Sequence, residues 1–199
     1  QTGYLEVATS GASGTIDFQM STFIVHVKDS GGSDFEGIKA SFNDYGNHYL
    51  SMGTTDPDGE ASIELFPGNY KFQAYKDHTQ NTDFLNVATS GTSGTVEFQT
   101  ALAEGFANDC DNGDPIEGIK ISFNDYGNHW LSMGTTGTDG KASIELFPGT
   151  GYKFQGYTQH TQEVKTADLP AAGLVVEFNP TRICFYPSPV KFNDYGNHW

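Results

Sequence analysis

The sequence of 199 residues carries a net charge of −15, and apart from Arg182 its cations are lysines. This acidic balance excludes the basic surface that nucleic-acid binding needs, so we expect no nucleic-acid partner. Aromatic residues at 14% and 24 glycines argue against disorder and favour short strands joined by tight turns. The longest apolar stretches, 23–27 and 173–176, are too short to cross a bilayer, so we expect no membrane span.

From residue 21 onward, apolar residues alternate with polar ones, as in a strand with one buried face. The first such stretch contains Phe23, Val25 and Val27. Others follow at 38–42, 63–65, 70–74 and 96–98, separated by turns rich in Gly, Asp and Pro. About seven short strands in roughly 80 residues are typical of an immunoglobulin-like β-sandwich, so we predict an all-β fold.

The strand pattern occurs twice because the chain contains an internal duplication. Residues 42–67 align with 123–148 with four differences, at 49/130, 56/137, 57/138 and 60/141. The match continues through 67–80 and 148–162, where one inserted residue lies in a turn, and a second block, 7–19, matches 87–99. Self-similarity of this length indicates tandem modules.

The repeats predict two complete β-sandwich modules, at 21–100 and 101–180. Each contains four Lys and eleven acidic residues, so each carries a charge of −7. Residues 1–20 then correspond to the terminal strands of a partial module, and 181–199 to the opening strands of another. Two hypotheses account for these partial modules. Either the chain is a window of a longer polyprotein, or 1–20 and 181–199 are donor segments that complete a neighbouring subunit by strand addition.

Two turns carry a resemblance to a known family. The residues concerned are Thr55, Asp56 and Gly59, then Pro67, Gly68 and Tyr70, and in the second copy Pro148, Gly149 and Tyr152. They resemble the signature of the prealbumin-like repeat of bacterial surface proteins, the collagen-adhesin B-type family. The resemblance covers both modules, and it implies prealbumin-like sandwiches in an extracellular stalk, pilus or surface fibre at the cell surface.

One feature of that family is an intramolecular isopeptide bond between Lys and Asn, promoted by a buried acid. Gln73 and Gln155 stand where the resemblance places the catalytic glutamate. Lys28 has no counterpart in the second module, and the position of Asn179 is occupied by Gln99 in the first. We therefore expect no such crosslink in this chain.

The heptapeptide FNDYGNH occurs at 42–48, 123–129 and 192–198 and has two interpretations. Asn and Gly accept positive φ, so the motif is typical of a tight turn after a strand. The aromatic residues beside it also suit contact between modules or subunits, or stacking on a sugar. The candidate contact residues are Tyr45, Tyr49, Tyr126, Trp130, Tyr195 and Trp199.

Two acidic turns supply the oxygen ligands that calcium prefers. Asp56 and Asp58 lie in the first turn, and Asp109, Asp111 and Asp114 lie in the second. Neither turn has the spacing of an EF-hand loop, and Gly137 replaces Asp56 in the second copy. Asp also favours turns without a metal. We therefore expect no metal or other cofactor, with calcium at these turns as the alternative.

The two cysteines, Cys110 and Cys184, lie in different sequence settings. They form either one disulfide or two buried thiols, and the sequence leaves both alternatives open.

The sequence gives no reason to expect an enzyme. Five of the six histidines occupy two repeated positions, without the spacing of a zinc site. No G-x-S-x-G nucleophile turn occurs, and catalytic groups duplicated in each module are unusual for an enzyme.

The main functional hypothesis is a structural subunit of an extracellular surface fibre or pilus-like filament. We expect it to associate with itself head to tail by β-strand complementation, or to pack against neighbouring modules of a polyprotein. The alternative hypothesis is a carbohydrate-binding or adhesive tandem module of a larger secreted protein, with a glycan as its partner.

Overall fold

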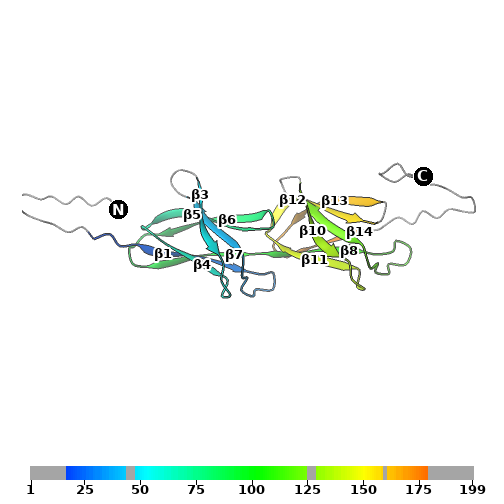
Figure 1. Cartoon of the computed structure of the whole chain (residues 1–199), viewed down its shortest axis with the longest axis horizontal. Helices are drawn as coiled ribbons and strands as arrows, with labels where there is room; N and C mark the ends of the chain where they lie inside the picture. Colours follow the sequence, from blue (N-terminus) through cyan, green and yellow to red (C-terminus); the bar gives the residue numbers. More distant parts are fainter. Residues whose placement is uncertain (1–16, 44–47, 125–128, 159–160, 179–199) are drawn as a thin grey trace, which may run out of the picture. The chain divides into compact units, whose positions relative to one another are not determined.

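A computed structural model describes residues 17–43, 48–124, 129–158 and 161–178 (Figure 1). All regular structure in these residues is β, and the chain divides into two compact units. Unit 1 comprises Gln1–Lys28, Gly32–Tyr75 and Asn81–Phe98, and unit 2 comprises Asp29–Gly31, Lys76–Gln80 and Gln99–Trp199. Within the described residues, no helix is long and apolar enough to cross a membrane.

Seven strands make up the first repeat. They are β1 (Ser21–Lys28), β2 (Lys39–Asn43), β3 (Tyr49–Thr54), β4 (Glu60–Leu65), β5 (Gly68–Lys76), β6 (Thr79–Val87) and β7 (Ser93–Gln99). They form a three-stranded sheet in the order β4-β1-β7 and a four-stranded sheet in the order β3-β2-β5-β6. β1 pairs antiparallel with β4, and β2 pairs antiparallel with both β3 and β5.

The second repeat has the same topology. Its strands are β8 (Ala101–Ala107), β9 (Lys120–Asn124), β10 (Trp130–Thr135), β11 (Lys141–Leu146), β12 (Gly149–Tyr157), β13 (Gln162–Leu169) and β14 (Leu174–Phe178). The sheets have the orders β11-β8-β14 and β10-β9-β12-β13, and β14 runs parallel to β8. The prediction of an all-β fold made of tandem immunoglobulin-like sandwiches is confirmed.

The predicted boundaries of the partial modules stay predictions. Residues 1–16 and 179–199 lie outside the described residues, and 17–20 precede β1 without forming a strand.

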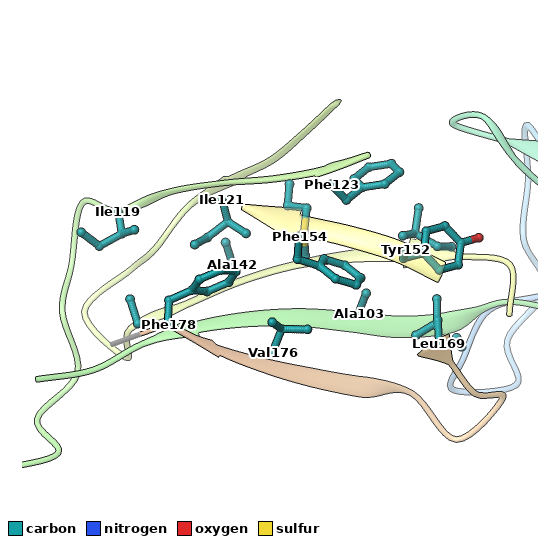
Figure 2. Packing of buried hydrophobic residues seen from close by; sticks show 14 residues of the cluster. Ala103, Ile119, Ile121, Phe123, Ala142, Tyr152, Phe154, Leu169, Val176 and Phe178 are labelled. Atoms are coloured by element: carbon teal, nitrogen blue, oxygen red, sulfur yellow. The ribbon is translucent and has the colours of Figure 1, made fainter. Parts of the chain in front are cut away.

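The core of each unit consists of side chains from every second residue of its strands. In β1 the buried positions are those expected from the alternation, Phe23, Val25 and Val27. Figure 2 shows the core of unit 2, where Ile121 and Phe154 of the four-stranded sheet point into the space that Val176 of β14 also enters. Burial of one face of both sheets is the main source of stability in so small a unit.

The turn before β4 explains the first half of the signature noted in the sequence. The buried Thr55 accepts a hydrogen bond from the N–H of Ile38 (3.0 Å) and donates one to the carbonyl of Phe35 (2.6 Å). Thr136 makes the same pair of bonds with Ile119 (2.9 Å) and Ile116 (2.7 Å). In each unit, one threonine hydroxyl thus joins two segments. It links the loop before β2 to the turn before β4 in unit 1, and the loop before β9 to the turn before β11 in unit 2.

The glycine of this turn is required by both φ and space. Gly140 has a φ of 73°, and a Cβ built on it lies 2.6 Å from the carbonyl oxygen of Ala107. Gly59 repeats this arrangement in unit 1, with a φ of 72° and a Cβ 2.6 Å from the carbonyl oxygen of Val27. Any side chain therefore has to displace the neighbouring backbone.

We expect Gly140→Ala to lower the free energy of unfolding well beyond the roughly 1–2 kcal/mol cost of a left-handed alanine. Gly113→Ala is the matched control, because Gly113 has a φ of 77° but open space around its Cβ. Urea denaturation of both variants provides the measurement. Equal losses in the two variants would show that the close approach at Gly140 has no energetic weight.

Candidate assembly surface

The aromatic residues that follow the FNDYGNH turn lie at an edge of each four-stranded sheet. Tyr49 opens β3 opposite Asn43, and Trp130 opens β10 opposite Asn124. Both aromatic rings are exposed. The structure thus presents one aromatic side chain per unit at equivalent positions. Their role in contact stays a prediction, and four further candidates lie outside the described residues: Tyr45, Tyr126, Tyr195 and Trp199.

The Phe-Pro-Gly turn between β4 and β5 has the same internal contacts in both units. The Tyr70 hydroxyl donates a hydrogen bond to the carbonyl of Phe66 (3.1 Å), and the Tyr152 hydroxyl donates one to the carbonyl of Phe147 (2.9 Å). The tyrosine ring also packs on the turn glycine, since a Cβ at Gly68 would lie 3.0 Å from the Tyr70 ring. These contacts explain the Pro-Gly-x-Tyr half of the signature.

The two copies of this turn differ in burial. Phe66 is 50% exposed, whereas Phe147 is 0% exposed. The Phe66 ring contacts Phe18 edge-on at 5.9 Å, and Phe18 and Met20 are themselves exposed. We call Phe18 and Phe66 the Phe66 patch. Exposed apolar side chains in contact with one another are typical of an interaction surface.

In unit 2, a turn from the first repeat is hydrogen-bonded to Phe147. The Phe147 N–H donates a hydrogen bond to the hydroxyl oxygen of Thr79 (3.1 Å), and that hydroxyl donates one to the carbonyl of Lys76 (2.8 Å). Thr79 is buried, and the turn before it has positive φ at Asp77 (46°) and His78 (63°). Positive φ at both residues is typical of a two-residue hairpin turn, here the one that joins β5 to β6.

A carboxylate provides a second attachment within unit 2. Glu145 accepts hydrogen bonds from the backbone N–H of Ser30 (3.2 Å), from the Ser30 hydroxyl and from the Thr100 hydroxyl (2.5 Å). Hydrogen bonds to a charged acceptor are stronger than neutral ones. Sequence reasoning missed this set, because Ser30 and Glu145 are 115 positions apart and neither belongs to a recognisable motif.

Hydrogen bonds within the acidic turns explain their aspartates without a metal. Asp56 accepts the N–H groups of Asp58 and Glu60, both at 3.0 Å, and Asp109 accepts the N–H of Asp111 at 2.8 Å. The ligand atoms of Asp109, Cys110 and Asp111 lie within 4.8 Å of one another, a group that could hold an ion. The expectation of no metal, and calcium as its alternative, both stay untested.

Cys110 is exposed, with its sulfur 3.8 Å from a carboxylate oxygen of Asp111. The alternative of a buried thiol is therefore wrong for Cys110. Cys184 lies outside the described residues, so the other alternative, a disulfide between them, stays untested.

A charge cluster on unit 1 was also missed from the sequence. The two ring nitrogens of His26 lie 2.9 Å from Glu97 and 2.8 Å from Asp34, and Lys28 forms an ion pair with Glu97 at 3.2 Å. Both nitrogens donate only in the imidazolium form. The one signal was that His26 falls outside the repeated histidine positions, since Phe106 occupies its place in the second repeat.

The cluster shifts two pKa values in opposite directions. Burial disfavours the imidazolium, but the hydrogen bonds to Glu97 and Asp34 outweigh it, so the pKa of His26 is raised above 6.5. The hydrogen bond from His26 lowers the pKa of Glu97 below 4.5, and Lys28 adds to this effect.

No protein-family model matches the chain, and no curated protein matches it. Similar folds occur among solved structures. The minor pilin GBS52 of Streptococcus agalactiae is 11% identical at a TM-score of 0.42, over 86% of this chain and 100% of that one. A streptococcal ancillary pilin is 14% identical at 0.39, over 83% of this chain and 64% of that one.

The Bacillus anthracis TIE protein is 13% identical at a TM-score of 0.36 over 81% of this chain, which spans only 33% of its length. Pilins recur among the similar structures. Because these TM-scores are below 0.5, we base the function on the chain's own residues.

The charge cluster makes stability depend on pH. The raised pKa of His26 contributes stability that is present below pH 6.5 and lost as the pH rises through its folded value. The lowered pKa of Glu97 contributes stability that is present above pH 4.5 and lost at lower pH. We therefore expect urea midpoints to fall between pH 6 and pH 8 in the wild type, and less so in His26→Gln. The same slope in both proteins would contradict a role for the cluster.

Proposed function

We propose that the chain is a structural subunit of an extracellular surface fibre or pilus-like filament, that it has no enzymatic role, and that it assembles head to tail by β-strand addition. The observation that carries this proposal is a second copy of an edge strand. The sequence of β7, SGTVEFQ, recurs at 13–19 as SGTIDFQ, with differences at 16/96 and 17/97. β7 already occupies its place beside β1 in unit 1, so the second copy suits a different sandwich.

The exposure of Phe18 supports this proposal. Phe98, at the equivalent position of β7, is 3% exposed, whereas Phe18 is 63% exposed. A phenylalanine with the sequence context of a core position therefore faces solvent in unit 1. Addition of 13–19 as a strand to another subunit would bury it, together with Ile16 two residues earlier, because alternate residues share one face.

The recipient that we propose is the three-stranded sheet of unit 2. β14 lies at its edge within the described residues, paired to β8 on one side, and Val175 on β14 is exposed. An open edge offers unpaired backbone groups to an incoming strand. Because the donor and the recipient are different surfaces, each added subunit leaves a new site free, and the assembly extends as a filament.

Ile16→Asp tests the donor strand, with Thr15→Asp as the matched control. Their equivalents in β7 are Val96, which is buried, and Thr95, which is exposed, so only the first change places a charge on the inner face. We expect Ile16→Asp to abolish pelleting of assemblies in ultracentrifugation, while its urea midpoint and that of Thr15→Asp stay unchanged. Normal assembly of Ile16→Asp would contradict strand addition.

A second candidate function is glycan binding. It is favoured by the exposed rings of Tyr49 and Trp130 at equivalent sheet edges, since aromatic faces stack on sugars. In that case we expect soluble oligosaccharides to change the fluorescence of Trp130, and Trp130→Ala to abolish the change. Fluorescence that stays constant at millimolar concentrations across a panel of glycans would remove this candidate.

A further inference from the structure

Two copies of one turn share their internal contacts but differ in what covers them. Phe147 is completely buried and its N–H is hydrogen-bonded to Thr79, whereas Phe66 is half exposed in the Phe66 patch. In both units the tyrosine of the turn donates a hydrogen bond from its hydroxyl to the carbonyl of the phenylalanine. The turn at Phe66 thus has the same internal hydrogen bond as the turn at Phe147. The turn at Phe147 is already bound to the turn that contains Thr79.

We propose that the Phe66 patch binds the connection between β12 and β13 of a second copy of this chain. This connection is the repeat equivalent of the turn that is hydrogen-bonded to Phe147: YKDHTQ at 75–80 aligns with YTQHTQ at 157–162, and Thr161 aligns with Thr79. The inference deepens the filament proposal, because it adds a side-chain contact to the same head-to-tail joint.

The flanks of this connection are exposed in the second repeat. Tyr157 and Thr161 are both exposed, whereas Thr79 is buried at the equivalent place in the first repeat. The connection is closed by a hydrogen bond from the Thr158 N–H to the Thr161 carbonyl (2.9 Å), and the two hydroxyls lie 2.7 Å apart. A closed turn with an exposed threonine and an exposed aromatic ring is thus available as the partner of Phe66.

In the proposed contact, the hydroxyl oxygen of Thr161 accepts the N–H of Phe66, as that of Thr79 accepts the N–H of Phe147. Tyr157 supplies apolar surface to the patch. The described flanks of the connection carry no charge, since Thr158 replaces Lys76, and the patch residues are themselves apolar. The contact therefore buries no unpaired charge.

Cysteine crosslinking tests the contact in the full-length chain with Cys110→Ser and Cys184→Ser. Thr79→Cys with Phe147→Cys is the positive control, because the two positions are hydrogen-bonded within unit 2. We expect Phe66→Cys with Thr161→Cys to form, on mild oxidation, a ladder of dimers, trimers and longer chains. Phe84→Cys, at an exposed position on β6, replaces Phe66→Cys in the negative control and should give at least tenfold less crosslinking.

Crosslinking of Phe66→Cys with Thr161→Cys at the level of the Phe84→Cys control would overturn the contact. Dimers alone, formed equally by Phe66→Cys without Thr161→Cys, would also overturn it, because they indicate a symmetric contact.

Phe66→Ser separates this inference from strand addition. We expect it to raise the protein concentration needed for assembly at least tenfold with an unchanged urea midpoint. Assembly that survives Phe66→Ser but fails in Ile16→Asp would overturn the Phe66 contact and leave the filament proposal intact. A wild-type chain that stays monomeric would overturn both.

Discussion

Each unit must build its core from only seven short strands. A core this small does not cover every apolar side chain in the turns at the ends of the sandwich. Phe147 and Phe66 show the consequence most clearly. Phe147 is completely buried, and its N–H is hydrogen-bonded to Thr79 in the turn at Lys76–Gln80. Phe66 has the same local structure but is half exposed. The different exposure of these two phenylalanines is the basis of the contact proposed for Phe66.

The fold could be predicted from the sequence because its determinants are local. Alternation marked the strands, Gly- and Asp-rich segments marked the turns, and the duplication doubled every signal. The signature residues also act locally. The Thr55 hydroxyl joins two loops, and Gly59 allows the carbonyl of Val27 to approach more closely than a Cβ would permit. Such features depend on neighbours in the same repeat, so one copy predicts the other.

The candidate surface could be predicted only in part. The exposed aromatic positions of Tyr49 and Trp130 followed from their place beside a turn. Phe66 and Phe147 lie in the same eight-residue sequence, ASIELFPG, so these neighbours do not separate the exposed residue from the buried one. The pairing of His26 with Glu97 joins positions 71 residues apart, and the bond from Phe147 to Thr79 spans 68. Contacts of this range are set by topology, which alternation alone does not specify.

Electron microscopy of the full-length protein at neutral pH tests the central claim, head-to-tail assembly, most directly. The account predicts filaments with a regular axial repeat of one chain, in which Phe66 of each subunit lies against the β12–β13 connection of the next and 13–19 lies beside β14. Discrete particles of one chain, at concentrations where surface fibres form, would contradict it.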